Sequence, residues 1–366
     1  MTNESVGPGP GQLQAKDIES FWQELVYQER HLALLPNQAF VTQANEILAR
    51  VAPDLALELE RSEGSLFSRL VFSAHGNIDQ FENLMALVRG APSLPGYKVQ
   101  AFRNRSPIKD FSMAMEGLEL SCSDVLVAHY DAGGIVGLEL GFEKIIAPEQ
   151  RELAQHMAFI MLDHVLGEWD FAVRVGPVDV VDAFAPEVAG VGPLSAFPAV
   201  FDAFLRDSLG RSYRFPPADD DRWKMLEARR RDAPADAVPD LLGLRLSANA
   251  VATRADLPYC LQWTLTFEDG ETLDQARDAQ EGLQAALERM ENGILAYTRI
   301  EGMRERTACY YVDDAAAARQ TLQQQAVALP GRVDVSFDPS WDAYLAVYAA
   351  AGAAAADAEH DDPEAA

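Results

Sequence analysis

The chain has 366 residues, and its 57 acidic and 30 basic side chains give a formal net charge of −27 at pH 7. A surface this negative repels nucleic-acid phosphates and anionic membranes, which excludes both as partners. It favours a basic protein partner, or it serves solubility alone. Hydrophobic residues make up 48% of the chain, as in an ordinary folded protein, and the length favours two domains over one.

The N-terminal end predicts a cytoplasmic protein. Residues 1–16 are rich in Gly and Pro without periodicity, so we expect a flexible leader. This leader has neither the basic nor the apolar segment of a signal peptide, and no apolar run in the chain approaches the length of a membrane span. We therefore expect neither secretion nor membrane insertion.

Residues 17–181 predict an N-terminal α+β domain of mixed sheet and helix. Helical periodicity predicts helices at 17–35, 38–51 and 78–88, and a long helix from Pro148 to about Gly167. Alternating patterns predict strands at 55–60, 66–73, 97–102, 113–120, 125–130, 135–142 and 171–181. The prolines within 182–218 then predict a connector that contains a short helix near 199–209.

Residues 219–350 predict a second α+β domain. Strands are expected at 223–228, 259–267, 294–300, 306–312 and 332–337, and helices at 272–290 and from Asp313 or Asp314 to about 328. Thr272 and Gln275 have the spacing of a capping box at the start of the first helix, and Asn292-Gly293 predicts its left-handed stop. From residue 259 onward the order strand, helix, strand, strand, helix, strand is the ferredoxin-like (βαββαβ) plan.

Three features of this second domain occur together. They are the helix opening at Thr272, the hairpin 302–306 that leads into Tyr310-Tyr311, and the closing sequence Asp-Pro-Ser-Trp-Asp-Ala-Tyr-Leu at 338–345. With them the segment from near Trp223, about a third of the chain, resembles an uncharacterised bacterial domain family related to regulator of ribonuclease activity B. That regulator is a small, acidic, ferredoxin-like protein that binds and inhibits ribonuclease E. The resemblance implies a nuclease-regulating role through protein binding, and it supplies no catalytic residue.

The last residues, 351–366, predict a disordered tail of Ala and acids. The carboxylates of this tail are available to a basic partner, although most such tails are simply solvated. The acidic residues are Asp357, Glu359, Asp361, Asp362 and Glu364.

The cysteines Cys122, Cys260 and Cys309 lack the spacing of a zinc site or a disulfide framework. Cys260 and Cys309 fall on neighbouring predicted strands, so their thiols can approach one another. The residues expected on the sheet face opposite the helices are Gln262, Thr264, Thr307, Cys309 and Tyr311. That face serves either as a protein-binding surface or as a packing surface for the N-terminal domain.

The strongest candidate for chemistry is the set His156, Asp163, His164 and Glu168 on the long helix. His156 and Asp163 are seven residues apart, and His164 and Glu168 are four apart, so each pair shares a helix face. Imidazole with carboxylate suits a transition metal or acid–base catalysis. The competing interpretation is structural, because an ordinary apolar stripe follows the same helix and neither His-x3-His nor His-Glu-x2-His occurs.

Two further motifs have structural explanations. The Gly-rich run 131–137 lacks the Gly-Lys-Ser/Thr end of a P-loop and lies between predicted strands, which indicates a hairpin. Arg229-Arg230-Arg231 is short and has no interleaved aromatic residues, which indicates a solvated face rather than a nucleic-acid site.

The sequence therefore predicts a non-enzymatic cytoplasmic protein that acts by binding a protein partner, with regulation or inhibition of a nuclease as the most concrete version. No residue is assigned a catalytic, cofactor-binding or metal-binding role, and no cofactor is expected. The alternative is a metal-binding protein or hydrolase with its site at His156–Glu168. A structural assembly module is a third option.

Overall fold

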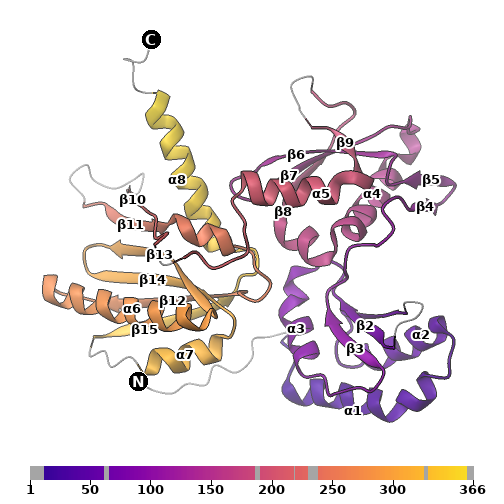
Figure 1. The fold of residues 1–366 in the computed structure, drawn as a ribbon, viewed down its shortest axis with the longest axis horizontal. Coiled ribbons are helices and arrows are strands. Elements are labelled where there is room, and N and C mark those ends of the chain that lie inside the picture. The colour runs from indigo at the N-terminus through magenta and orange to yellow at the C-terminus, as the bar shows by residue number, and fades with distance from the viewer. Residues whose placement is uncertain are drawn as a thin grey trace. The chain divides into compact units, whose positions relative to one another are not determined.

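The computed structural model of the chain describes residues 12–61, 66–185, 190–217, 219–229, 238–324 and 329–360, as backbone alone from 353. It is a mixed α+β protein with several sheets (Figure 1). The α-helices are α1 Ala15–Leu32, α2 Asn37–Leu48, α3 Phe81–Arg89, α4 Arg151–Leu166, α5 Phe197–Ala203, α6 Gly270–Met290, α7 Ala315–Gln323 and α8 Asp342–His360. Short 3-10 helices are η1 Ile78–Gln80, η2 Pro148–Gln150, η4 Leu194–Ala196 and η6 Leu246–Val251, and short π-helices are η3 Asp170–Arg174 and η5 Phe204–Ser208.

The strands form four sheets in the described parts of the chain. Their orders are β1-β2-β3, β4-β5, β8-β7-β6-β9 and β10-β11-β13-β14-β12-β15. The strand bounds are β1 Ala56–Glu60, β2 Ser68–Ser73, β3 Tyr97–Ala101, β4 Ser112–Met115, β5 Leu118–Ser121, β6 Val125–Asp131, β7 Val136–Phe142, β8 Val175–Val180, β9 Gly192–Pro193, β10 Trp223–Ala228, β11 Asp240–Arg245, β12 Tyr259–Thr266, β13 Gly293–Glu301, β14 Glu305–Val312 and β15 Gly331–Phe337.

The chain forms two compact units. Unit 1 comprises the described residues within Met1–Ala128, Glu139–Val175 and Asp179–Pro198. Unit 2 comprises those within His129–Leu138, Gly176–Val178 and Ala199–Ala366.

Two predicted strands of the N-terminal part are wrong in detail. The run 113–120 is a hairpin, β4 and β5, because Glu116 and Gly117 both have positive φ and make a two-residue turn that reverses the chain. The segment 171–181 begins as the η3 helix and becomes a strand only at Val175. In both segments the apolar residues alternate as in a strand, but the backbone does not form one continuous strand.

The C-terminal sheet has six antiparallel strands. The sequence predicted five, namely the four strands of the ferredoxin-like plan and a leading strand at 223–228. The strand that was missed is β11, which pairs with β10 on one side and β13 on the other. Its residues 240–245 follow the alternating pattern only weakly, since Gly243 interrupts a run of leucines. The sheet therefore has one strand more than the sequence predicted, and two more than a βαββαβ plan contains.

Both faces of this sheet are buried over its central strands β12, β13 and β14. One face packs on α6 and α7 through residues such as Trp263, Leu283 and Leu322. The other packs on η6 and the start of α8. Of the two alternatives for that face, a protein-binding surface is wrong, because Thr307, Cys309 and Tyr311 are all buried. The other alternative, a packing surface, describes the face correctly, but the residues that cover it belong to unit 2 and not to the N-terminal domain.

The closing Asp-Pro-Ser-Trp sequence is what covers the second face. The Trp341 ring stacks on Tyr311, with ring centroids 3.8 Å apart and planes 8° apart. The Trp341 indole N–H donates to the Leu257 carbonyl at 3.0 Å, and the Tyr311 hydroxyl donates to Asp338 at 2.6 Å. Asp338 also accepts from the backbone N–H of Asp342 at 2.8 Å, so one carboxylate starts α8 and anchors the sheet.

The ends of α6 differ from expectation by a few residues. The N-cap is Asp269, and Thr272 is the reciprocal N3 partner rather than the cap itself. The left-handed residue at the C-terminal end is Glu291, with φ of 52°, and Gly293 already belongs to β13. Asp314 caps α7 as expected, although residues 325–328, where that helix was expected to end, lie outside the described residues.

The tail expected at 351–366 is helical as far as His360, as the end of α8. The acids Asp361, Asp362 and Glu364 lie outside the described residues, as do residues 1–11 of the expected leader. Among the helices that the structure describes, none combines the length and the apolar character needed to span a bilayer.

Trp341→Ala should lower the free energy of unfolding by about 3–5 kcal/mol, because a fully buried ring and its stacking contact with Tyr311 are lost from the cover of the sheet. Chemical denaturation monitored by circular dichroism measures this. The matched control is Met225→Ala, whose side chain is 67% exposed in the same unit. A loss below about 1 kcal/mol for Trp341→Ala would contradict the role assigned to this ring.

Candidate functional site

The residues of the predicted helix site do not form one cluster. α4 ends at Leu166 because Gly167 takes a φ of +80°, so Glu168 lies beyond the helix and shares no helix face with His164. His156 is exposed, whereas Glu168 is fully buried. Within the described residues, no three or more His, Cys, Asp or Glu side chains are grouped so as to hold a metal ion.

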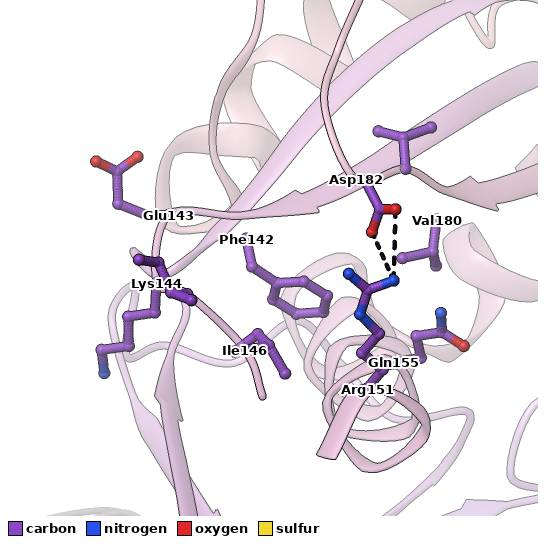
Figure 2. Close-up of a pocket in the computed structure, with 10 residues that line it drawn as sticks. Phe142, Glu143, Lys144, Ile146, Arg151, Gln155, Val180 and Asp182 are labelled. Carbon is purple, nitrogen blue, oxygen red and sulfur yellow. Dashed lines mark hydrogen bonds and ion pairs between the residues drawn. The ribbon is translucent and has the colours of Figure 1, made fainter. Parts of the chain in front are cut away.

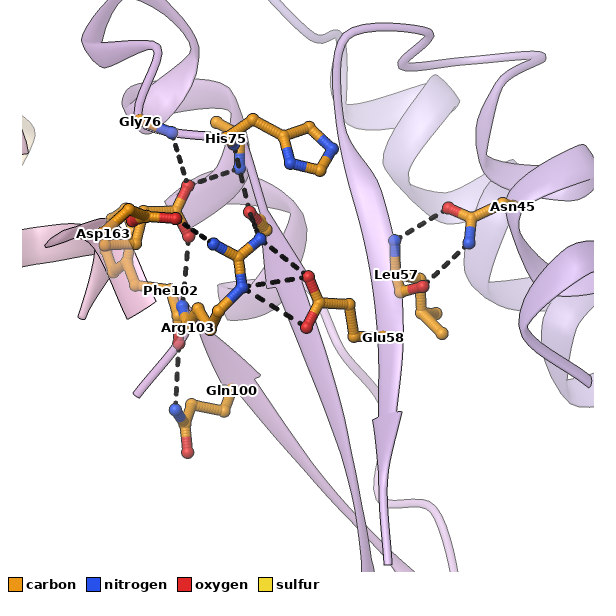
Figure 3. A network of polar contacts seen from close by, with 12 residues as sticks. Asn45, Leu57, Glu58, His75, Gly76, Gln100, Phe102, Arg103 and Asp163 are labelled. Atoms are coloured by element: carbon orange, nitrogen blue, oxygen red, sulfur yellow. Dashed lines mark hydrogen bonds and ion pairs between the residues drawn. The ribbon is translucent and has the colours of Figure 1, made fainter. Parts of the chain in front are cut away.

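Asp163 instead belongs to a polar network around Arg103 (Figure 3). The Arg103 guanidinium lies between Asp163 and Glu58, with Nη2 2.8 Å from the Glu58 Oε1 atom, and it also donates to the Ser73 hydroxyl at 3.2 Å. Burial raises the pKa of Asp163, although the positive charge of Arg103 opposes this. A buried arginine held by two carboxylates in this way connects β1, β2 and α4 of unit 1.

The carboxylate of Glu168 accepts hydrogen bonds from three backbone N–H groups. Its Oε1 atom accepts the N–H of Ala74 at 2.7 Å and of Gly76 at 3.1 Å, and its Oε2 atom accepts the N–H of Arg103 at 3.1 Å. A carboxylate with three backbone donors has little capacity left for a metal or a substrate. Gly167 permits this arrangement, because a Cβ there would lie 3.1 Å from the Arg103 carbonyl.

Glu168→Ala should lower the free energy of unfolding of unit 1 by about 3–5 kcal/mol, because three backbone N–H groups lose their acceptor and Arg103 loses a nearby negative charge. Denaturant unfolding compares it with Glu152→Ala, an exposed acid on α4. Equal stability of the two variants would refute the structural role.

His164 packs its ring edge-on against Phe111, with centroids 6.0 Å apart, and its backbone carbonyl accepts the N–H of Ser106 at 2.7 Å. Burial lowers the pKa of His164, and the positive charge of Arg103 lowers it further, while Asp163 and Glu58 act in the opposite direction. His164 therefore stays neutral in the folded state at pH values where the unfolded chain takes up a proton.

This linkage predicts that stability falls as the pH drops from 7.5 to 5.5, through the ordinary pKa of histidine. In His164→Gln the fall should be smaller, because the unfolded chain no longer gains that proton. The measurement is the free energy of unfolding at pH 7.5, 6.5 and 5.5, with His156→Gln as the exposed control. If the pH dependence of His164→Gln matches that of the unaltered protein, His164 does not contribute as stated.

A shallow pocket of about 290 Å³ lies beside the start of α4 in unit 1 (Figure 2). Arg151 projects across it and forms an ion pair with Asp182 at 3.0 Å, with both side chains largely in solvent. Lys144 at its rim is paired with Asp124 at 2.8 Å. Both cations therefore already have carboxylate partners, and the exposed pair of Arg151 with Asp182 contributes little energy.

Cys260 and Cys309 approach one another as the strand plan predicted, with their Sγ atoms 3.3 Å apart and both thiols free and buried. Burial raises the pKa of Cys309 well above its usual range. The third thiol, Cys122, is also buried, and its burial raises its pKa to about 11. The hydrogen bond with Cys309 lowers the pKa of Cys260, but the Cys260 side chain is only 1% exposed. A thiol that is shielded from solvent, or whose pKa is raised, is a poor nucleophile, so none of the three is a candidate catalytic group.

The Gly-rich run is a hairpin turn between β6 and β7, as predicted, where the Asp131 carboxylate accepts the N–H of Gly134 at 2.6 Å. Of the basic cluster, only Arg229 lies within the described residues.

A surface feature that the sequence analysis did not single out is an acidic stripe along α6. Glu271, Asp274, Asp278 and Glu281 recur at helical spacing and all four are exposed. The opposite side of the helix is buried on the sheet. One basic residue, Arg277, lies beside this stripe and forms an ion pair with Asp274 at 3.1 Å. The heptad-like spacing of these acids was available in the sequence.

Comparison with protein-family models, curated proteins and solved structures found no match to this chain.

Proposed function

We propose that this is a cytoplasmic, non-enzymatic protein that regulates a nuclease by binding it, with α6 of unit 2 as the contact surface. The observation that carries the proposal is the acidic stripe of Glu271, Asp274, Asp278 and Glu281 on the exposed side of α6. An ordered row of carboxylates on a rigid helix attracts a basic partner over the range of a Debye length.

The topology of unit 2 supports the same proposal. Within its sheet the four strands β13-β14-β12-β15 have the neighbours of a ferredoxin-like (βαββαβ) core, and α6 and α7 pack on one face (Figure 1). We propose that β10 and β11 are an addition to that core. The proposed relationship to the family of regulator of ribonuclease activity B then places a ribonuclease first among the partners to test.

A direct assay follows. The full chain is added to purified ribonuclease E while cleavage of a fluorogenic RNA is recorded at 50 mM and 300 mM salt. Inhibition at the lower salt should weaken at the higher salt, because attraction between surface charges is screened. Absence of inhibition at 50 mM salt would contradict this partner.

Neutralising the stripe should weaken the inhibitory complex by about tenfold or more, because each exposed carboxylate adds to the attraction. The variant combines Glu271→Gln, Asp274→Asn, Asp278→Asn and Glu281→Gln. Its matched control removes the same number of exposed acids from unit 1, through Asp54→Asn, Glu116→Gln, Glu149→Gln and Glu152→Gln. Equal weakening in both variants would show that net charge, and not α6, is responsible.

A further inference from the structure

Unit 2 contains a groove in whose lining two buried polar atoms, one of Arg306 and one of Gln280, have no hydrogen-bond partner in the protein. Of the acidic stripe on α6, Glu281 also lines this groove. The groove has a volume of about 560 Å³, which lies in the range of small-molecule sites. We call it the α6 groove. Its lining includes Trp223, Gly243, Gln280, Glu281, Thr298 and Arg306.

The groove arises from the extra width of the sheet. α6 packs on β12, β13 and β14, and the sheet continues past the helix as β11 and β10 (Figure 1). Side chains of α6 therefore form one wall, and β10, β11 and β13 form the floor. The floor is largely apolar where Leu295 and Ile300 lie.

Arg306 lies at one end of the α6 groove and is 8% exposed. Its Nη1 atom is buried without a hydrogen-bond partner, and no carboxylate in the described residues forms an ion pair with it. The other buried arginines of the described chain are all satisfied: Arg103 and Arg245 by carboxylates, and Arg211 by backbone carbonyls. A buried guanidinium without a counter-ion is unfavourable for stability, so its retention indicates a ligand.

Gln280 supplies the second unsatisfied group. Its side-chain N–H group donates to the carbonyls of Trp263 at 2.9 Å and of Arg306 at 3.2 Å, which fixes the orientation of the amide. The Oε1 atom is then left buried without a donor. The lining of the groove thus includes one cationic donor, Arg306, and one neutral acceptor, Gln280.

Gly243 keeps the floor of the groove open. A Cβ at this position would lie 2.9 Å from the Thr298 hydroxyl and 3.3 Å from the Met225 sulfur, and all three residues line the groove. Glycine in the middle of a strand weakens it and is often found where a ligand approaches the backbone. A larger side chain here would have to displace Thr298 and Met225, which themselves line the groove.

Charge selects the kind of anion. Burial and the positive charge of Arg277 lower the pKa of Arg306, while Tyr310 and the negative charge of Glu281 act in the opposite direction. Asp221, Glu281 and Glu288 also line the groove, and their negative charges disfavour a dianion such as phosphate. A single carboxylate matches the planar guanidinium in two parallel hydrogen bonds.

We propose that the α6 groove binds an acylamino carboxylate, either a free N-acyl amino acid or the C-terminus of a peptide. Its carboxylate pairs with Arg306 and its amide N–H donates to the Oε1 atom of Gln280. The rest of the ligand lies along the apolar floor over Gly243.

The test is NMR of the full chain with labelled methyl groups, followed at Met225, Leu295 and Ile300 while N-acetylglycine is added. We expect saturable shifts, with a dissociation constant on the order of 1 mM for so small a probe. The uncharged probe N-methylacetamide should give none. Acetyl-tetraglycine separates the two sources: tighter binding than N-acetylglycine indicates a peptide C-terminus, and equal binding indicates a free acyl amino acid.

Arg306→Met should weaken binding at least tenfold while the melting temperature stays the same or rises, because an unpaired buried charge is replaced by an apolar chain of similar length. Arg332→Met is the matched control, on the exposed edge strand β15 of the same sheet, and should bind normally. A merely structural arginine would show the reverse, with lost stability and unchanged binding.

Gly243→Val provides a second test that leaves Arg306 in place, and it should also reduce binding at least tenfold by filling the floor. The proposal is overturned if the unaltered protein shows no saturable shift with either carboxylate probe. It is equally overturned if both Gly243→Val and Arg306→Met bind as the unaltered protein does.

Discussion

The structure of unit 2 depends on covering both faces of one sheet. α6 and α7 cover the first face, and the Trp341 ring, stacked on Tyr311, begins the cover of the second. Asp338 links the two halves of that second cover, because its carboxylate binds the Tyr311 hydroxyl and also the first backbone N–H of α8. Because both faces of the central strands are closed, the described surface of unit 2 that a partner can reach consists of helix surfaces, loops, the outer strands and the α6 groove.

The buried polar residues of the protein are of two kinds, those whose hydrogen-bonding groups are satisfied and those with an atom left unpaired. Arg103 and Arg245 are buried and each is held by two carboxylates, and Glu168 is buried with three backbone donors. Such groups are expensive to desolvate but are fully satisfied, so they serve the fold. Arg306 with Gln280 departs from this pattern. Unsatisfied buried groups beside an open groove, rather than clusters of titratable residues, are therefore the stronger sign of a binding site in this molecule.

The two proposals use neighbouring but different parts of α6. The acidic stripe faces solvent and acts through long-range attraction, which salt weakens. The α6 groove lies beside the helix and acts through short, directed hydrogen bonds to one buried guanidinium. A ligand in the groove would contact Glu281, which also belongs to the stripe. Glu281 therefore belongs to both surfaces, so a ligand bound in the groove can affect the contact with a protein partner, and the partner can affect ligand binding.

The sequence by itself determined most of the local structure. Period-two alternation located β12, and one of the two predicted acids, Asp314, caps α7, because both features depend on patterns within a few residues. The approach of Cys260 to Cys309 followed from the predicted order of the strands. Only the tertiary structure decided that β11 widens the sheet, that α8 buries Tyr311, and that Glu168 binds backbone amides instead of sharing a site with His164. Each of these outcomes depends on which distant segments meet, since burial and unsatisfied hydrogen bonds are properties of packed surfaces and have no local pattern in the chain.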